Sequence, residues 1–588
     1  MTMHAPETEL PGDETPARSA FSLGPAAGFF KRLFSTNLAK SRGRIRLLAL
    51  GFVCLFATIN VRLIYLGFKP DPQSIRRAAA DALSGARPDI LDRNGEVLAT
   101  DVKVMSVFAE PRRIIDKDEA TELLTAVLPD VNARELRDRL ASRKGFVWVK
   151  RGITPKQQQE VYHLGLPGVG FLPENKRVYP NGPIAAHVLG FANLDNVGIA
   201  GIEKYIDGQG LADLHNAGFS LTPDGLKPIQ LSLDLRLTHG LRDEIAKGIE
   251  KYRAKAGGGA ILDVNTGEVV ALASLPDYDP NNPADALDPL HINRLAVGVY
   301  EMGSTFKAIS IAMALELNKV TLRSSVDARQ SLRFGRFTIH DFHATHRILT
   351  VPEVFTHSSN IGTARMALMV GVEGHKAFLK KMGQLDRLRT ELPESAAPLV
   401  PKHWGDLNTI TIAFGHGMAV APLQAVMGVS ALANGGLLIP PTFLKRSEEE
   451  AKAIAKRVIK PETSEKMRFL MRLNAEIGTA RKANVDGYYI GGKTGTAEKV
   501  INGRYAKKRV LTAFTAIIPA DKPRYQLLIM LDEPQALKET YGFITSGWNA
   551  VPTAGNVITR IAPLLGIEPR FDLPPSDRLI LAASKTTQ

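Results

Sequence analysis

The sequence is poor in cysteine: its 588 residues contain one, Cys54. A single cysteine excludes an intramolecular disulfide and a cysteine-based metal site. Because Cys54 lies in an apolar run, we interpret it as a small hydrophobic residue and not as a nucleophile.

The sequence also lacks stretches in which basic and aromatic residues alternate, although its formal net charge is +14. Such an excess first suggests a polyanionic partner such as nucleic acid or anionic lipid. RNA-binding modules interleave the two residue types, so we expect a basic surface and no nucleic-acid partner. Repeats at solenoid periods are also missing, and the length predicts two or more domains.

Long apolar runs are scarce, and the one at residues 47–68 therefore stands out. As a helix it would span about 33 Å, enough to cross a bilayer core. Between Phe21 and Arg46 there are six basic residues and no acidic one. The positive-inside rule then predicts a cytoplasmic N-terminus and an exported C-terminal part, which is the periplasm if the membrane is an inner membrane.

The apolar run is interrupted by Asn60 and Arg62, which leaves Leu47–Ile59 unbroken. That length also suits a cleavable signal peptide, but the nearest Ala-x-Ala site, Ala78–Ala80, is far away. We therefore predict an uncleaved, single-pass signal anchor. An arginine inside a membrane segment either snorkels outward or faces a partner helix, so a membrane partner is a secondary expectation.

Composition divides the chain into five expected parts. They are a basic cytoplasmic tail at 1–46, the anchor at 47–68, a loop-rich module at 70–225, a larger domain at 226–575 and a flexible tail at 576–588. In the 70–225 module, charged helical stretches are predicted at 116–127 and 131–140.

The larger domain is predicted to have the α+β fold class, an antiparallel sheet with helices packed on it. Strands are expected at both of its ends, with Asn265-Thr266-Gly267 as a hairpin turn between the first two. Helical patterns fill the middle. The predicted strands are 260–264, 268–274, 487–497, 509–518 and 525–531, and the predicted helices include 304–317 and 351–370.

Three short strings in the larger domain carry chemistry. They are Ser304-Thr305-Phe306-Lys307, Ser358-Ser359-Asn360 and Lys493-Thr494-Gly495-Thr496. Alone, the first is common by chance and the second reads as a helix cap. In this order the three are the signature of penicillin-reacting serine enzymes.

The first string places a serine and a lysine on one helical face near a helix N-terminus. A serine becomes nucleophilic at neutral pH only with a base, which Lys307 can supply if it is neutral. Keeping a lysine neutral at pH 7 requires roughly 4–5 kcal/mol. Burial and a second cation, here Lys493, both act in that direction. Ser358 could then relay a proton, and Asn360 offers a donor and an acceptor to a peptide.

Two other patterns suggest different chemistry. Residues 487–494 fit a phosphate-binding loop, but Tyr488 and Tyr489 favour a strand, so we do not expect nucleotide binding. His340, His343 and His346 have a spacing that resembles metal ligands. No His-Glu-x-x-His string accompanies them, and a surface loop explains them as well. No metal or other cofactor is expected, and His416 is given no catalytic role.

On these motifs the chain resembles the class B penicillin-binding proteins, and within them the cell-division type. The resemblance includes the strings Asp92-Arg93-Asn94-Gly95, Arg177-Val178-Tyr179-Pro180, Gly201-Ile202-Glu203 and Gly478-Thr479-Ala480. The sequence departs from the family pattern at Met302 and at Arg87-Pro88. The resemblance implies a short cytoplasmic tail, one membrane helix, an elongated pedestal domain and a periplasmic penicillin-binding domain.

The resemblance also implies roles. Ser304 would be acylated, with Lys307 as its base, and Ser358, Asn360 and Lys493 would assist. Lys493, Thr494 and Thr496 would hold the substrate carboxylate, Gly495 would let its backbone approach, and the N–H groups of Ser304 and Thr496 would form the oxyanion hole. The substrates would be peptidoglycan stem peptides on nascent lipid-linked glycan, with β-lactams as inhibitors.

Partners and alternatives also follow. With no glycosyltransferase module evident, the resemblance implies a SEDS polymerase of the FtsW type and other division proteins at the septum. An elongation-type transpeptidase, a D,D-carboxypeptidase or a serine β-lactamase would use the same site. A penicilloyl sensor or membrane scaffold is the non-enzymatic alternative.

Overall fold

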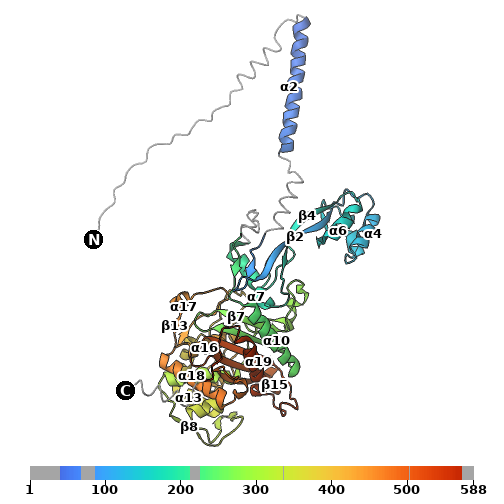
Figure 1. Cartoon of the computed structure of the whole chain (residues 1–588). Coiled ribbons are helices and arrows are strands. Elements are labelled where there is room, and N and C mark those ends of the chain that lie inside the picture. The colour runs from blue at the N-terminus through green and yellow to red at the C-terminus, as the bar shows by residue number, and fades with distance from the viewer. Residues whose placement is uncertain (1–39, 68–85, 212–225, 336, 502, 573–588) are drawn as a thin grey trace, which may run out of the picture. The chain divides into compact units, whose positions relative to one another are not determined.

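The computed structural model describes residues 40–67, 86–211, 226–335, 337–501 and 503–572 (Figure 1). The chain forms two units, Met1–Ala78 and Ala79–Gln588. Residues 1–39 of the tail predicted at 1–46, the tail predicted at 576–588 and the Ala78–Ala80 string lie outside the described residues.

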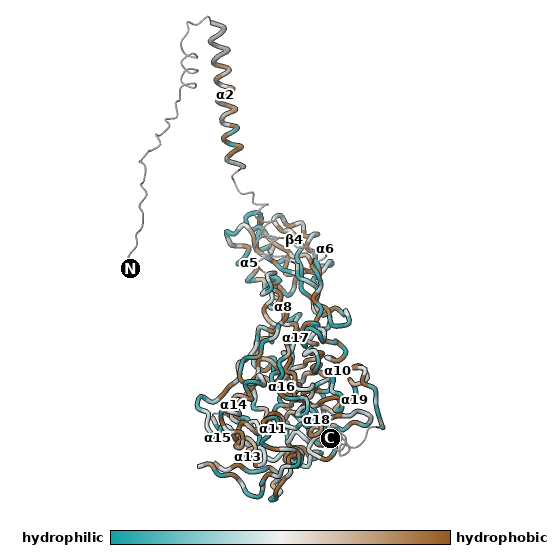
Figure 2. Tube along the Cα trace, turned by 90° about the vertical axis from the view of Figure 1, so that its left-hand side faces the viewer, coloured by the Kyte–Doolittle hydropathy of each residue, from teal (hydrophilic) through white to brown (hydrophobic). Residues whose placement is uncertain are grey.

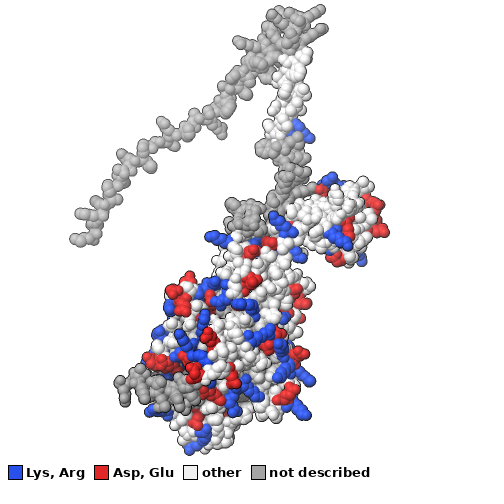
Figure 3. Space-filling view, viewed as in Figure 1, with Lys and Arg blue, Asp and Glu red and all other residues white. Residues whose placement is uncertain are grey.

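Within the first unit, the described residues form one helix, α2 (Lys40–Gly67). Its stretch Leu47–Tyr65 has a mean hydropathy of 2.2 and is long enough to cross a membrane. Hydrophobic residues predominate along it (Figure 2), and most of its surface carries no charge (Figure 3). The apolar helix predicted at 47–68 is confirmed.

The larger unit begins with a five-stranded sheet. Four strands follow the order β3-β2-β1-β5, and β4 also pairs with β2. Their bounds are β1 (Ile90–Leu91), β2 (Val97–Ala109), β3 (Val147–Ile153), β4 (Val169–Val178) and β5 (Ile229–Gln230). Strand β5 runs parallel to β1, so the segment after residue 226 starts on this sheet.

Three helices pack beside β2 and β3 around an apolar core that includes Val107, Leu124 and Leu136. They are α4 (Lys117–Val127), α5 (Ala133–Ala141) and α6 (Pro155–His163). The helices predicted at 116–127 and 131–140 are confirmed. They start after Asp116 and Asn132 because these side chains accept hydrogen bonds from the first free N–H groups.

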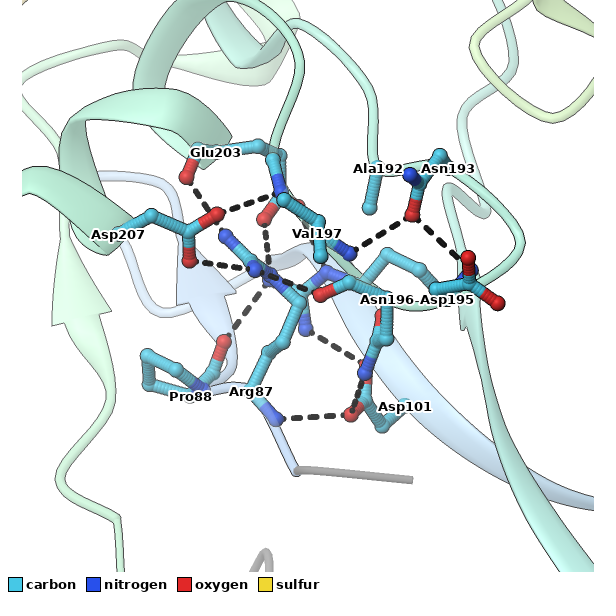
Figure 4. A network of polar contacts seen from close by, with 12 residues as sticks. Arg87, Pro88, Asp101, Ala192, Asn193, Asp195, Asn196, Val197, Glu203 and Asp207 are labelled. Carbon is cyan, nitrogen blue, oxygen red and sulfur yellow. Dashed lines mark hydrogen bonds and ion pairs between the residues drawn. The ribbon is translucent and has the colours of Figure 1, made fainter. Parts of the chain in front are cut away.

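A buried ion network ties this sheet to α8 (Gly201–Ile206) and the turn η1 (Asp207–Leu211) (Figure 4). The short helix α7 (Ala186–Leu189) packs beside α8. Arg87 is 1% exposed and binds Glu203 and Asp207, each at 2.7 Å. Arg177 binds the other oxygen of Glu203 at 2.6 Å and Asp101 at 3.2 Å. Glu203 itself is 0% exposed, and its carboxylate bridges the two buried guanidinium groups, whose charges Asp207 and Asp101 also balance. Removing one partner of such a cluster leaves an uncompensated buried charge.

The second sheet is antiparallel throughout, in the order β14-β15-β16-β6-β7. Its strands are β6 (Ala256–Asp263), β7 (Val269–Leu275), β14 (Gly491–Ile501), β15 (Arg504–Ile518) and β16 (Tyr525–Asp532). Helices α10 (Leu235–Lys251) and α19 (Ala550–Ile561) pack on one face. Helices α11 (Lys307–Glu316), α16 (Pro422–Ala433) and α18 (Pro461–Glu476) lie on the other. Both faces are therefore covered, which is why β16 is apolar at almost every position.

The remaining elements lie between β7 and β14 or beside α19. The helices and turns are η3 (Pro283–Leu287), η4 (Pro289–His291), η5 (Gly303–Phe306), α12 (Val351–Thr356), α13 (Asn360–Val370), α14 (Val372–Lys381), α15 (Asp406–Ala413), α17 (Glu448–Ile454), η6 (Arg481–Ala483) and η7 (Ser546–Trp548). The short strands are β8 (Ser325–Asp327), β9 (Leu332–Phe334), β10 (Phe337–Ile339), β11 (Ile348–Thr350), β12 (Leu437–Leu438) and β13 (Lys456–Arg457).

The α+β architecture is confirmed, with two differences from the predicted elements. The helix predicted at 351–370 is broken between α12 and α13, where Ser358 has a φ of 56°. The strand predicted from residue 487 starts at Gly491, because Gly487 has a φ of 79° and turns the chain there. Lys/Arg and Asp/Glu residues are interspersed on the visible surface of the larger unit (Figure 3).

We predict that Glu203→Gln lowers the free energy of unfolding of the larger unit by about 3 kcal/mol. The amide would keep the size of the side chain but turn an NH₂ group toward Arg87 or Arg177. Denaturant unfolding of the full-length protein measures the change. Glu135→Gln is the matched control, because its pair with Arg139 is exposed and should contribute less than about 0.5 kcal/mol. Equal effects of the two substitutions would contradict the prediction.

Candidate active site

Ser304 lies in the turn η5, directly before α11, beside the edge strand β14. Two glycines allow this close approach. A Cβ on Gly303, whose φ is 52°, would lie 2.6 Å from the carbonyl oxygen of Thr496, and a Cβ on Gly495 would lie 2.6 Å from that of Met302. The turn and the strand therefore meet backbone to backbone, and Ser304 is half-buried at this junction.

Two lysines are wholly buried behind the serine. The side chains of Lys307 and Lys493 are both 0% exposed, and both donate to the hydroxyl of Ser358. The Nζ–Oγ distances are 3.1 Å from Lys307 and 2.9 Å from Lys493. Lys307 also donates to the carbonyl oxygen of Ser358. The hydrogen bonds of Lys307 among the described residues thus go to Ser358, and the expected direct contact with Ser304 is not among them.

Burial lowers the pKa of Lys307 to about 7, and the negative charge of Asp341 opposes part of this shift. Burial and then the positive charge of Lys307 also hold the pKa of Lys493 well below its usual range. Two ammonium groups so close to one hydroxyl repel each other, which favours a state with at least one neutral amine. The group Lys307–Ser358–Lys493 can therefore accept a proton near pH 7 and pass it along.

Ser358 is held in place by its neighbours. Ser359 caps α13, where its Oγ accepts from the N–H of Gly362 at 2.9 Å. The same Oγ donates to Asp341 Oδ2 at 2.7 Å, and Asp341 Oδ1 accepts from the N–H of Ile361 at 2.9 Å. This carboxylate thus fixes the turn that holds Ser358 in a left-handed conformation, one that a non-glycine residue adopts only at a cost.

Asp341 was missed in the sequence, because it lies inside the string that drew attention for its histidines. His340, His343 and His346 are exposed. Besides the side chain of Asp341, the backbone of this loop contacts the site: Asn360 Nδ2 donates to the carbonyl oxygen of His340 at 2.9 Å. Within the described ranges, no group of three His, Cys, Asp or Glu side chains could hold a metal ion.

The third string lies on β14 as a strand, as predicted, and not as a phosphate-binding loop. Thr494 Oγ1 shares a hydrogen bond of 2.7 Å with Thr479 Oγ1, and Thr496 Oγ1 accepts from the N–H of Ser546 at 3.1 Å. The string Gly478-Thr479-Ala480 was the only sequence signal for Thr479. Ser546 had none, because its role depends on η7 folding back against β14.

The structure thus brings the predicted Ser304, Lys307, Ser358, Lys493, Thr494, Gly495 and Thr496 to one junction between η5, α11, β14 and the turn after α12. Asn360 lies at the edge of this group, with its amide turned to the loop at His340. Two buried amines, a hydroxyl between them and a serine at a helix start can carry out acyl transfer through a covalent intermediate.

Two family models match the chain. The penicillin-binding protein transpeptidase domain matches residues 257–547. The penicillin-binding protein dimerisation domain matches residues 82–209.

Several proteins of known name are similar over most of the chain. A probable peptidoglycan D,D-transpeptidase FtsI of Caulobacter vibrioides is 40% identical and covers 84% of each chain. A probable peptidoglycan D,D-transpeptidase PenA of Neisseria gonorrhoeae is 33% identical over 90% of this chain and 94% of its own. The peptidoglycan D,D-transpeptidase FtsI of Escherichia coli is 29% identical over 84% of this chain and 86% of its own.

Solved structures share the fold. A peptidoglycan synthetase from Bifidobacterium adolescentis aligns with a TM-score of 0.64 at 22% identity, covering 84% of this chain and 98% of its own. The TP domain of penicillin-binding protein 3 from Burkholderia pseudomallei aligns with a TM-score of 0.52 at 28% identity, covering 58% of this chain and 98% of its own.

The pKa of Lys307 predicts how reactivity depends on pH. Only its neutral amine can accept the proton of a serine, so the rate of labelling by a fluorescent penicillin should fall about tenfold per pH unit below pH 7 and level off above it. Gel fluorescence of the full-length protein in detergent measures this rate. A rate that stays constant from about pH 5 to pH 8 would be inconsistent with Lys307 as the base.

Asp341→Asn is a second test of Lys307 as the base. Asp341 raises the pKa of Lys307, so removing its charge should lower that pKa and move the fall in rate toward lower pH. The amide oxygen can still accept from one of the two groups that Asp341 binds. Asp327→Asn, an exposed carboxylate paired with Arg329, is the control and should leave the pH profile where it is.

Proposed function

The chain belongs to the class B penicillin-binding proteins, and on this basis we propose that it is a peptidoglycan D,D-transpeptidase acting in cell division. Its nucleophile is Ser304. The observation that supports this best is the hydroxyl of Ser358 held between the buried amines of Lys307 and Lys493. A relative named FtsI, 40% identical over most of both chains, supports the same reaction and the division role.

In the first half of the reaction, Ser304 Oγ attacks the carbonyl carbon between the last two D-Ala residues of a stem peptide. Its proton passes to neutral Lys307. The Oγ–C bond forms, the C–N bond breaks, and the proton returns through Ser358 to the leaving amine of D-Ala. The N–H groups of Ser304 and Thr496 stabilise the oxyanion, which is supported by the backbone contact of η5 with β14.

Substrate binding is assigned to the β14 edge. Lys493, Thr494 and Thr496 present an ammonium group and two hydroxyls to the terminal carboxylate of the peptide. Gly495 leaves room for the peptide backbone to lie along the strand. Asn360 contacts the peptide from the opposite side. In the second half of the reaction, an amine of a neighbouring strand replaces D-Ala and forms the crosslink.

The apolar helix α2 makes the chain a single-pass membrane protein. We propose that its N-terminus is cytoplasmic and that the larger unit is periplasmic, because six basic residues and no acidic one lie between Phe21 and Arg46, before the apolar stretch Leu47–Tyr65. A SEDS polymerase of the FtsW type would supply the glycan strands, with Arg62 as a contact within the membrane. The septum is the proposed site of action.

We predict that Ser304→Ala abolishes the covalent adduct with fluorescent penicillin and the formation of crosslinks on reconstituted peptidoglycan. The alanine removes the only atom that forms the acyl bond. Mass spectrometry of the labelled wild-type protein should place the adduct on Ser304. Ser310→Ala, on the adjoining helix α11 and bonded to the carbonyl oxygen of Ala413, is the control and should retain labelling. An adduct on the Ser304→Ala protein would exclude the mechanism.

Depletion of the protein in its host should give filamentous cells, because septal crosslinking would stop while elongation continues. Phase-contrast microscopy together with membrane staining measures cell length and the number of septa. Rounded cells would instead indicate the elongation role.

A further inference from the structure

A second group of titratable side chains lies around the turn that carries Ser304, and the mechanism above does not use it. It consists of Glu301, His416 and Tyr505, and we call it the Glu301 cluster. Glu301 comes three residues before Ser304, His416 lies in the loop after α15, and Tyr505 lies on β15 close to its start. Three separate parts of the chain thus converge next to the nucleophile.

The loop that carries His416 is pressed against the nucleophile turn. The N–H of Gly303 donates to the carbonyl oxygen of Gly415 at 3.2 Å. A Cβ on Gly415 would lie 1.9 Å from the carbonyl oxygen of Gly303, so only glycine fits at that position. The position of His416 relative to Ser304 is therefore set by backbone contact and not by a flexible side chain.

Glu301 is half-buried, and its two oxygens have different surroundings. Oε1 accepts from the N–H of Gly417 at 2.8 Å and from the hydroxyl of Tyr505 at 3.1 Å. Oε2 is buried and has no hydrogen-bond partner among the described residues. Burial raises the pKa of this carboxyl. A cation next to Oε2 would give this unpaired oxygen a partner, and it would also offset the cost of burying the charged carboxylate.

His416 is also incompletely bonded. Its Nδ1 is buried without a partner among the described residues, and its ring lies 5.9 Å from that of Tyr505. Burial, and then the positive charge of Lys307, lower the pKa of His416 to about 4. The imidazole is therefore neutral at pH 7, so it can accept a hydrogen bond and does not repel a cation.

The second half of the proposed reaction needs a site that binds a cation. The acceptor is a primary alkyl amine, which is protonated near neutral pH. It must approach an acyl group that lies beside two buried lysines, whose positive charges oppose a cation. Glu301, three residues before Ser304, is a carboxylate whose hydrogen bonds among the described residues go to Gly417 and Tyr505 and not to either lysine.

We propose that Glu301 and His416 form the subsite that receives the acceptor ammonium group in the transfer half of the reaction. Tyr505, whose hydroxyl donates to Glu301 Oε1, is 48% exposed, so the carboxylate lies directly behind a side chain at the surface. The proposal rests on the proposed transpeptidase function and adds to it the residues that select the acceptor.

The transfer step balances as follows. The ammonium nitrogen gives up two protons and bonds to the carbonyl carbon of the acyl-enzyme, while the bond from that carbon to Ser304 Oγ breaks. One proton returns to Ser304 Oγ, and the other passes through Lys307 to solvent. Glu301 and His416 bind the ammonium group before these transfers and take no proton themselves.

The test uses the full-length protein in detergent, with a thioester of an acylated D-alanine as donor and Nα-acetyl-lysine as the amine. The ratio of aminolysis to hydrolysis is measured against amine concentration. Glu301→Gln keeps an oxygen for Gly417 and Tyr505 but lacks the charge. It should raise the half-saturating amine concentration about tenfold or more. His416→Phe, which keeps the ring contacts, should change it in the same direction.

Three controls make the result specific. Labelling by fluorescent penicillin should stay within about twofold of wild type, because acylation does not involve the acceptor. Hydroxylamine, a nucleophile that is uncharged at neutral pH, should react equally well with wild type and Glu301→Gln. Glu498→Gln removes a carboxylate from β14 within electrostatic reach of Tyr505 and should leave the amine dependence unchanged.

An unchanged amine dependence in Glu301→Gln would overturn the proposal. So would a parallel fall in penicillin labelling and aminolysis, because it would show that the cluster only supports the nucleophile turn. Failure of the wild-type protein to be labelled at Ser304 would instead refute the proposed function itself.

Discussion

The burial of two lysines around one hydroxyl is the constraint on which this site depends. Lys307 and Lys493 are both fully buried, and both donate to Ser358. An isolated ammonium group in such surroundings would be strongly destabilising, so the protein keeps the proton shared and mobile. Neutrality, which a nucleophilic serine requires of its base, is thus a consequence of packing. The remaining structure has to hold these amines in place without giving either a carboxylate partner of its own.

Two carboxylates lie near the site, and neither is a hydrogen-bond partner of Lys307 or Lys493. Asp341 holds Ser359 and the start of α13, and it affects Lys307 through space without a hydrogen bond to it. Glu301 comes three residues before Ser304 and is bonded to Gly417 and Tyr505. Acidic groups are therefore placed where they shape the site or receive a cation, and not where they would keep a lysine protonated. The N-terminal part of the larger unit differs, because there Glu203 forms direct ion pairs with Arg87 and Arg177. These charges stabilise the fold.

The sequence predicted much of the fold because its signals were local. The turn Asn265-Thr266-Gly267 predicted the β6–β7 hairpin, and the capping residues Asp116 and Asn132 mark where α4 and α5 begin. The break between α12 and α13 was not predicted. Residues 351–370 have a helical pattern throughout, and the left-handed Ser358 is stabilised by Asp341, a residue from a distant loop.

By itself the sequence determined which residues we propose for the chemistry, because the three motifs have fixed order and fixed residue types. It also determined that the chain has an apolar segment long enough for a membrane. Only the tertiary structure decided how the two lysines share Ser358, since the contact joins residues 135 positions apart. The same holds for Asp341, Thr479 and the Glu301–His416–Tyr505 group. Their roles arise from packing between distant elements, and both burial and pKa depend on that packing and on no local pattern.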